Sequence, residues 1–132
     1  MNLEILKIAS DTINHKKLDD CTHKSKHKNH LCGDVIEVGI KISKNKILDF
    51  AYQCKSCIYC QASASLLSRN VKNKTISKIQ FLLKEADNLF KNKKIHLNKD
   101  WKSFLKIMNK SNILRKECLL LPIKATLKAL KN

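Results

Sequence analysis

The chain has 132 residues, of which 43% are hydrophobic and 29% charged, a composition typical of one folded domain rather than of a disordered segment. Its 27 basic residues exceed its 11 acidic residues, which gives a formal net charge of +16. No apolar run approaches the roughly 18 residues of a membrane span, and the first residues do not resemble a signal peptide. We therefore expect a single cytoplasmic domain over residues 1–132, whose six cysteines are free thiols or metal ligands rather than disulfides.

The positive charge raises the question of whether the protein binds nucleic acid. Nearly all of the basic residues are lysines, and arginine, which suits bidentate contacts to bases and phosphates, occurs only at Arg69 and Arg115. Aromatic residues make up 5% of the chain and do not alternate with basic residues as they do in a stacking platform. We expect salt-dependent, nonspecific attraction to polyanions and no specific nucleic-acid partner.

In chain order, the first predicted element is an amphipathic helix within residues 2–14, and a polar, cationic loop follows over 15–31. Two runs in which apolar and polar residues alternate, 35–42 and 47–53, are separated by four polar residues and predict a β-hairpin. The residues expected on the buried face of this hairpin are Ile36, Val38, Ile40 and Ile42 in the first strand and Leu48, Phe50 and Tyr52 in the second.

Helical spacing dominates the rest of the chain. A helix rich in small and apolar residues is expected after Cys57, and Thr75 is a suitable N-cap for a helix that ends near Lys91. Asp100 is a suitable cap for a shorter helix, and the last helix is expected to begin near Pro122, because proline is tolerated in a first turn. The shorter helix contributes three residues to the predicted core, Trp101, Phe104 and Met108. A short sheet followed by helices predicts an α+β domain.

Three cysteines lie close together in the sequence, at Cys54, Cys57 and Cys60. Their C-x2-C-x2-C spacing matches the start of a bacterial ferredoxin motif, but the fourth cysteine of that motif is replaced by Ala64 and the motif is not repeated. A structural zinc knuckle requires a second cysteine pair, and a redox-active pair is expected within a βαβ unit, which the predicted elements lack. The spacing alone therefore favours neither an electron carrier nor a zinc knuckle.

A second set of cysteines comes from three separated positions. Cys32 precedes the first predicted strand, Cys57 lies where a strand gives way to a helix, and Cys118 precedes the last predicted helix. Loops at the ends of packed elements can converge at one end of a small domain, and the positive end of a helix favours a thiolate. Three thiolates and one carboxylate would supply four metal ligands, and an aspartate would leave the site more exchangeable than a fourth cysteine.

These segments resemble the NifU/IscU-type scaffolds of iron–sulfur cluster assembly, over residues 2–130. The residues that carry the resemblance are Cys32-Gly33-Asp34-Val35-Ile36, Cys57-Ile58-Tyr59-Cys60-Gln61-Ala62-Ser63-Ala64-Ser65, and Cys118 followed by Leu120-Leu121-Pro122. The resemblance implies a SufE/NifU-like α+β fold, in which a small antiparallel sheet of about three strands packs against four to five helices. The third strand would come from the polar stretch before Cys32.

The resemblance also implies a chemistry. In such scaffolds a cysteine desulfurase passes persulfide sulfur to a thiol, iron(II) binds, and a [2Fe–2S] cluster forms and is released to acceptor apoproteins. It assigns Cys32, Asp34, Cys57 and Cys118 as the ligands, with Asp34 as the labile one and Cys118 as the leading sulfur acceptor. Cys60 is a candidate spare ligand, or alternatively a small buried hydrophobe. The protein would then be a scaffold and carrier rather than an enzyme.

Some residues depart from the family pattern and leave an alternative open. Glu117 stands where many members have histidine, and residues 112–116 replace the Leu-Pro-Pro-Val-Lys chaperone-recognition motif. Residues 54–56 replace a glycine-rich turn and should be stiffer. The alternative is a zinc-binding, SufU-like partner of a cysteine desulfurase, in which the same four residues hold Zn²⁺ and a thiol accepts sulfur. The interval 58–117 does not obviously contain the SufU insertion, which favours the cluster scaffold.

Overall fold

The computed structural model describes residues 3–31, 33–90 and 99–131. Its sheet has three antiparallel strands in the order β1-β2-β3, formed by β1 (His23–Lys28), β2 (Val35–Ser43) and β3 (Lys46–Lys55). The helical elements are α1 (Leu3–Ala9), α2 (Ile58–Asn70), α3 (Ile76–Leu89), the 3₁₀ segments η1 (Lys99–Lys106) and η2 (Lys110–Arg115), and α4 (Lys116–Leu130). The predicted α+β fold with a three-stranded sheet is confirmed.

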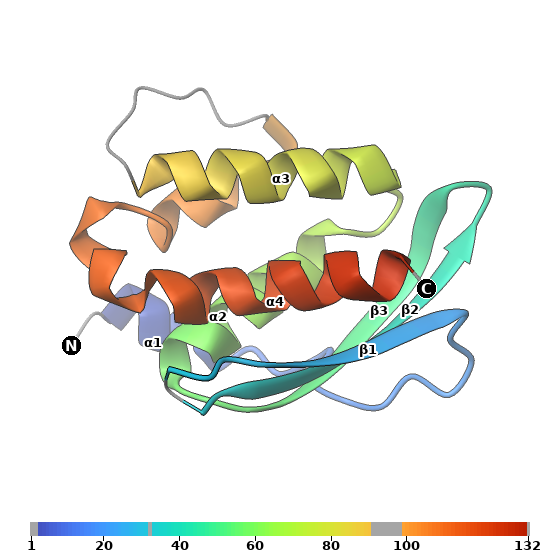
Figure 1. Cartoon of the computed structure of the whole chain (residues 1–132), viewed down its shortest axis with the longest axis horizontal. Helices are drawn as coiled ribbons and strands as arrows, with labels where there is room; N and C mark the ends of the chain where they lie inside the picture. The colour runs from blue at the N-terminus through green and yellow to red at the C-terminus, as the bar shows by residue number, and fades with distance from the viewer. Residues whose placement is uncertain (1–2, 32, 91–98, 132) are drawn as a thin grey trace.

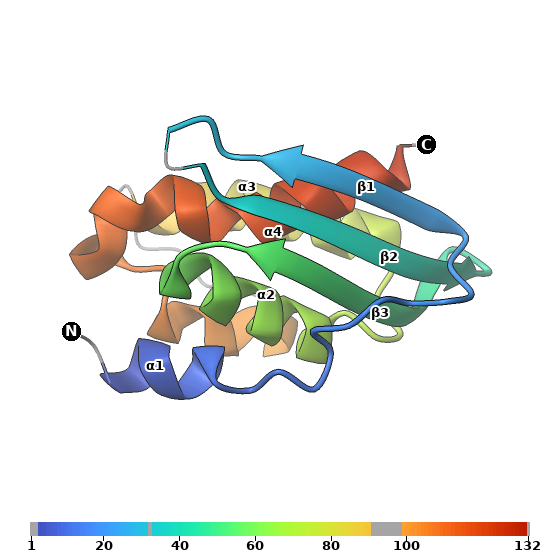
Figure 2. The ribbon, with the colours of Figure 1, turned by 90° about the horizontal axis from the view of Figure 1, so that it is seen from below.

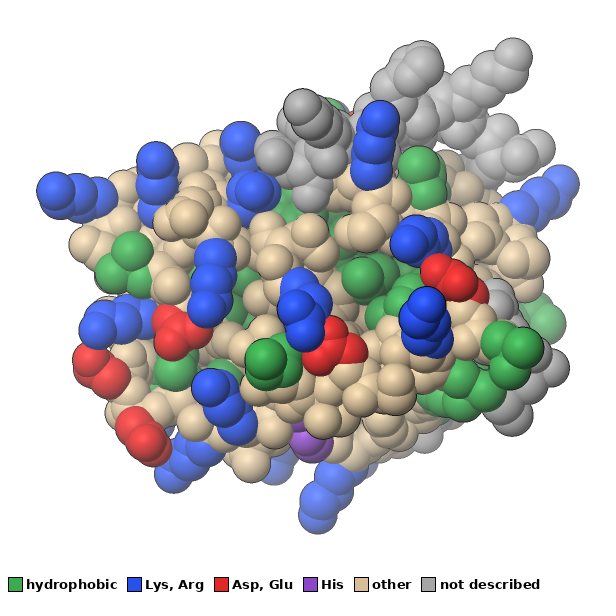
Figure 3. Space-filling model, turned by 180° about the vertical axis from the view of Figure 1, so that it is seen from behind, with side chains coloured by type: hydrophobic (Ala, Val, Ile, Leu, Met, Phe, Trp, Pro, Cys, Tyr) green, Lys and Arg blue, Asp and Glu red, His purple; other side chains and the backbone are tan. Residues whose placement is uncertain are grey.

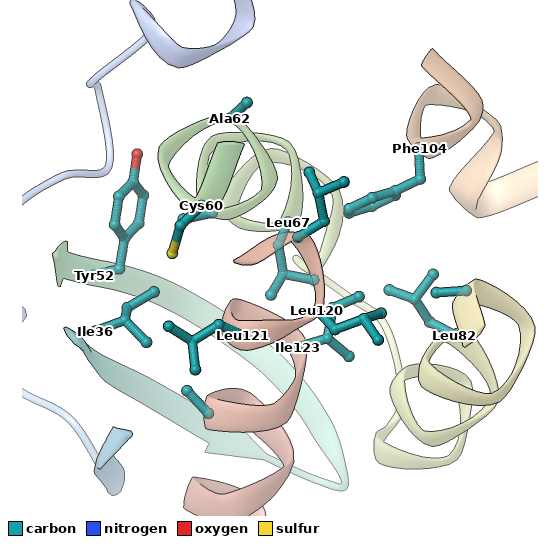
Figure 4. Packing of buried hydrophobic residues seen from close by; sticks show 14 of the residues in the cluster. Ile36, Tyr52, Cys60, Ala62, Leu67, Leu82, Phe104, Leu120, Leu121 and Ile123 are labelled. Atoms are coloured by element: carbon teal, nitrogen blue, oxygen red, sulfur yellow. The ribbon is translucent and has the colours of Figure 1, made fainter. Parts of the chain in front are cut away.

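The helices cover one face of the sheet (Figures 1 and 2). Helix α4 packs on β1 and β2, α2 packs on β3, and α1 lies against α2. Helix α3 packs on α4 on the side away from the sheet (Figure 1). Residues from both layers form one buried cluster, in which α4 contributes Leu120, Leu121 and Ile123 (Figure 4). Trp101, Phe104 and Met108 belong to this cluster, as predicted.

Strand β1 lies within the segment predicted as a loop, so that prediction is wrong for His23–Lys28. Its inward-facing side chains are polar and only partly buried, and they therefore show no hydrophobic alternation. One of them, the Ser25 hydroxyl, donates a hydrogen bond of 2.6 Å to the carbonyl of Ala125 in α4. The third strand that the family resemblance placed before Cys32 is thus present, held by polar contacts.

The β2–β3 hairpin is tighter than predicted. Lys44 and Asn45 have φ of 50° and 64°, as in the two-residue turns that match the twist of a hairpin. Farther along, Lys41 pairs with Asp49 but Ile42 pairs with Ile47, so Leu48 is the extra residue of a bulge. Ile47 is therefore fully buried while Leu48 is 47% exposed. The prediction that Leu48 faces the core is wrong because the bulge shifts the alternation by one residue.

Two helix starts differ from the predictions and one agrees. Helix α4 begins at Lys116, so Pro122 lies inside it, and Asp100 lies within η1 rather than before it. An interior proline costs about 3 kcal/mol because it lacks an N–H, and the buried leucines that precede Pro122 offset this cost. Thr75 is the N-cap of α3, and its hydroxyl accepts a hydrogen bond from Lys78 N–H. The predicted helix end near Lys91 lies outside the described residues.

The other face of the sheet is crossed by the chain between α1 and β1 (Figure 2). Tyr52 N–H in β3 donates to the carbonyl of Asn14, which fixes this segment to the sheet edge. A Cβ on Gly39 would lie 3.3 Å from Leu18 Cβ and 3.7 Å from Cys21 Cβ. A residue without a side chain therefore lets the segment approach the sheet. In the part of the chain that the structure describes, no helix is both long and apolar enough to cross a membrane.

Candidate metal centre

Three of the four predicted ligands meet at one end of the sheet. One ligand atom each from Asp34, Cys57 and Cys118 lies within 4.8 Å of the other two. Asp34 directly precedes β2, Cys57 directly precedes α2, and Cys118 is the third residue of α4. The fourth predicted ligand, Cys32, lies outside the described residues. The prediction that Cys118 precedes the last helix is wrong, because α4 begins before it.

Asp34 is positioned by the turn that joins β1 to β2. Asn29 N–H donates to the Asp34 carbonyl at 2.8 Å, and Gly33 N–H donates to the Asn29 carbonyl at 2.8 Å. Gly33 has a φ of +76°, in the left-handed region that glycine adopts without steric cost. The Asn29 side-chain oxygen also accepts a hydrogen bond from Leu31 N–H. This turn holds Asp34 at the start of β2, where it is only 5% exposed.

The Asp34 carboxylate joins this turn to the start of α2. Its Oδ1 accepts a hydrogen bond of 3.0 Å from Cys57 N–H, and its Oδ2 accepts one of 3.3 Å from the Cys57 thiol. Cys57 is the N-cap residue of α2, and its own side chain makes no capping hydrogen bond. A carboxylate at this position interacts favourably with the positive end of the helix. Asp34 is therefore both a candidate ligand and a structural partner of Cys57.

Cys118 reaches the site through the packing of α4 against α2. The Ser63 hydroxyl in α2 donates a hydrogen bond of 2.5 Å to the carbonyl of Leu119, and this contact is buried. It fixes the first turn of α4 beside α2 and leaves Cys118 4% exposed. Glu117, which stands where many family members have histidine, binds Lys124 Nζ at 3.0 Å, two turns farther along α4. Its carboxylate is thus held by a lysine of its own helix.

The two extra cysteines beside Cys57 have different environments. Cys60 is fully buried near Tyr52 and Leu121 (Figure 4), and this burial raises the pKa of its thiol. The group whose ligand atoms converge does not include Cys60. Cys54, to which the sequence analysis gave no role, is partly exposed. These two cysteines are equally spaced from Cys57 in the sequence. Their different burial results from the packing of β3 against α2.

The segments next to the candidate ligands in the sequence carry two exposed leucines and a cation–π contact that were not predicted. Leu31, next to Cys32, is 86% exposed, and Leu114, four residues before Cys118, is 96% exposed. The Arg115 guanidinium carbon lies 5.3 Å from the centre of the Tyr59 ring, in a cation–π contact between the start of α4 and the first turn of α2. Leu31 and Leu114 could have been noted as apolar residues in otherwise polar segments, whereas the Arg115–Tyr59 contact depends on the fold.

The chain matches the model of the NifU-like N-terminal domain over residues 4–97. It belongs to this family. The matched range includes Cys32, Asp34 and Cys57 and ends before Cys118. The iron–sulfur cluster assembly scaffold protein IscU of Thermotoga maritima is 33% identical over 73 residues, which are 55% of this chain and 51% of that protein. The chain thus spans about half the length of this curated relative.

Two solved structures show the same fold. The N-terminal part of a nitrogen-fixing NifU-like protein from Brucella abortus superposes with a TM-score of 0.90 at 21% identity, covering 98% of this chain and 91% of that one. A protein described as an iron–sulfur cluster assembly scaffold for the SUF system of Fervidobacterium islandicum superposes with a TM-score of 0.85 at 24% identity, covering 98% and 96%. The NifU-like arrangement of sheet and helices predicted from the sequence is confirmed.

Proposed function

We propose that this protein is a scaffold on which a [2Fe–2S] cluster is assembled and from which it is passed to acceptor apoproteins. The observation that carries the proposal is the convergence of Asp34, Cys57 and Cys118 within 4.8 Å in a NifU-like domain. Two thiols and a carboxylate are ligands that suit iron in such clusters. Cys32, which precedes Asp34 by two residues, is proposed as the remaining ligand.

Sulfur is proposed to arrive as a persulfide of a cysteine desulfurase. A scaffold thiolate attacks the outer sulfur, the sulfur–sulfur bond to the desulfurase breaks, and the desulfurase cysteine leaves as a thiolate. We propose Cys118 as the leading acceptor, because it lies in the first turn of a helix whose positive end favours the thiolate. At 4% exposure it can be reached only if the start of α4 shifts. Cys57 is the more exposed thiol.

Asp34 is proposed as the ligand that makes the cluster transferable. A carboxylate binds iron less strongly than a thiolate does in clusters of this type. Its release also leaves it with hydrogen-bond partners, because Cys57 N–H already lies 3.0 Å from Oδ1. The same carboxylate can therefore leave the metal without being stranded in a site where it is 5% exposed. This combination suits a site that must both hold and release its cargo.

The alternative function is a zinc-bearing sulfur-transfer partner of a cysteine desulfurase. It is favoured by the burial of two of the converging residues, Asp34 at 5% and Cys118 at 4% exposure, because structural zinc sites are closed and tetrahedral. In this case the same four residues would hold Zn²⁺, and a thiol released from the metal would accept sulfur. The protein would then act as a sulfur carrier and would build no cluster.

Anaerobic reconstitution distinguishes these functions. The chain is mixed with iron(II), cysteine, a thiol reductant that converts persulfide sulfur to sulfide, and a catalytic amount of cysteine desulfurase, and visible absorption, iron and acid-labile sulfide are measured. The scaffold predicts a coloured [2Fe–2S] species that Cys32→Ser, Cys57→Ser and Cys118→Ser weaken, whereas Cys21→Ser, on the opposite face of the sheet, leaves it intact. A colourless protein that holds one zinc and stimulates the desulfurase would support the alternative. Binding of neither metal nor sulfur would refute both.

The basic surface is proposed to attract an acidic face of the desulfurase. Lysines are spread among the acidic and apolar side chains of the face shown in Figure 3 rather than gathered in one stripe, and the net charge of +16 acts on any acidic partner. We propose a cytoplasmic scaffold with no specific nucleic-acid partner. The desulfurase complex should weaken steeply with added salt, and a dissociation constant that does not change between low and high ionic strength would contradict this docking mode.

A further inference from the structure

Cys118 has to be uncovered before it can accept sulfur, because its side chain is only 4% exposed. The chain that follows it is firmly held. The side chains of residues 119–121 are each at most 2% exposed, and the Ser63 hydroxyl binds the Leu119 carbonyl in a buried contact. A movement that exposes Cys118 therefore involves the residues before Leu119 rather than the whole of α4.

The chain that precedes Cys118 is held at Asn112. This residue is 7% exposed, and its side-chain amide donates a hydrogen bond of 2.7 Å to the carbonyl of Ile107. Its φ of −107° and ψ of 20° are not helical and mark a kink within η2. The two residues after it pack little, since Ile113 is 42% and Leu114 96% exposed. Residues 113–118 thus form a short segment between two buried anchors.

The first turn of α4, within this segment, has no side-chain cap. Arg115 occupies the N-cap position with φ of −108° and ψ of 16°, and its side chain makes no capping hydrogen bond. A helix start without such a cap is less stable, because a side-chain acceptor for its first N–H groups is missing. Side-chain contacts with the neighbouring helices are then what holds this turn against the domain.

Two such contacts join the turn to α2 and α3. The Arg115 guanidinium carbon lies 5.3 Å from the centre of the Tyr59 ring in α2, and Lys116 Nζ lies 2.6 Å from Asp87 Oδ1 in α3. Tyr59 packs against the buried cluster, so its ring is a fixed platform. A partly exposed ion pair contributes little on its own. The cation–π contact is the one that connects the first turns of α2 and α4, near the two converging thiols.

We propose that Tyr59 and Arg115 form a clamp that keeps Cys118 covered, and that a sulfur donor reaches this thiol when the clamp opens. The inference rests on the proposed function, in that Cys118 is the sulfur acceptor. Tyr59 and Arg115 are positioning residues, because they act through the first turn of α4. When closed, the clamp helps to hold Cys118 within 4.8 Å of the other converging ligand atoms. When open, the two buried anchors stay in place, so the movement does not require unfolding of the domain.

The experiment measures how fast iodoacetamide alkylates Cys118 in the metal-free chain, by mass spectrometry of the tryptic peptides. Cys21, on the opposite face of the sheet, is the reference thiol in the same sample. We expect Tyr59→Leu to raise the Cys118 rate about 2- to 5-fold, as the loss of an exposed cation–π contact increases the population of the open form. Tyr59→Phe keeps the ring and should retain the wild-type rate. In an Arg115→Gln background, Tyr59→Leu should give no further increase.

Thr75→Ala is the control for general destabilisation, because it removes the N-cap of α3 and leaves both clamp residues intact. It should not change the Cys118 rate. Equal rates in the wild type and Tyr59→Leu, or an equal increase in Thr75→Ala, would overturn the clamp.

Sulfur transfer is measured separately, as persulfide on Cys118 after incubation with cysteine and a cysteine desulfurase. Tyr59→Leu should acquire this persulfide faster than the wild type, and Tyr59→Phe should match the wild type. Faster alkylation of Tyr59→Leu together with no persulfide on Cys118 in any variant would refute the proposed acceptor and leave the clamp supported. Persulfide that forms at the same rate in Tyr59→Leu and the wild type would show that the clamp does not control sulfur transfer.

Discussion

Replacing Asp34 separates its two roles, because alanine and asparagine remove different parts of the side chain. Alanine removes the acceptor for Cys57 N–H, a hydrogen bond of 3.0 Å at a residue that is 5% exposed. Leaving such a donor unsatisfied costs about 1–3 kcal/mol, and loss of the charge beside the start of α2 adds about 0.3–1 kcal/mol. Asparagine keeps an oxygen at the acceptor position and loses only the charge.

We therefore expect Asp34→Ala to lower the free energy of unfolding of the metal-free chain by about 2 kcal/mol, and Asp34→Asn to lower it by less than about 1 kcal/mol. Urea unfolding followed by circular dichroism measures both values, with Cys21→Ser as a control variant away from the site. If alanine and asparagine cost the same, the hydrogen bond to Cys57 N–H does not stabilise the start of α2, and the structural role assigned to Asp34 is wrong.

The same two variants test the proposed lability of Asp34. Despite their lower stability, both should release a reconstituted cluster to an acceptor apoprotein more slowly than the wild type, because the exchangeable ligand is gone. The visible absorption and circular dichroism of the cluster during transfer give the rates. Faster release from both Asp34 variants than from the wild type would refute the labile-ligand role.

Three further predictions concern Ser63, Thr75 and Tyr52. Ser63→Ala should lower the free energy of unfolding by about 1–3 kcal/mol, because the buried hydrogen bond to the Leu119 carbonyl is lost. The same substitution should weaken Co²⁺ binding, because the start of α4 moves. An unchanged Co²⁺ affinity would contradict this. Thr75→Ala should cost about 1 kcal/mol through the lost N-cap of α3 without affecting Co²⁺ affinity, which makes it a control for general destabilisation. Burial raises the pKa of Tyr52 to about 12. The neutral phenol is favoured in the folded state, so its contribution to stability is complete below a pH of about 10 and is lost as the pH rises toward 12. Ultraviolet absorbance measured against pH should show a phenol that ionises near pH 12. Tyr52→Phe should remove this transition.

The hairpin and the strand before it show where hydrophobic patterning succeeds and where it fails. Alternation correctly predicted both strands of the hairpin, because Ile36, Val38 and Ile40 face a core made by the helices. It missed β1, whose inward side chains are histidines and a serine that bonds to α4. It also misplaced Leu48, because a bulge leaves no mark in the pattern of residue types. Only the family resemblance indicated a third strand.

The helix boundaries were least predictable where tertiary packing outweighs local preference. Proline favours a first helical turn, but in α4 the apolar residues Leu119, Leu120 and Leu121 extend the helix toward its N-terminus, because each is at most 2% exposed. This extension decides the position of Cys118 inside the helix rather than in a loop. The family resemblance named Asp34, Cys57 and Cys118, which converge in the structure, whereas their burial depends on contacts between distant segments.

The site is assembled from the starts of a strand and two helices, and this explains how it can carry several negative ligands. Cys57 and Cys118 lie at or within the first turns of α2 and α4, whose unpaired N–H groups favour anions. The proposed set of three thiolates and a carboxylate would carry a charge of −4, of which a divalent ion would neutralise only part. The two helix starts would favour the remaining negative charge.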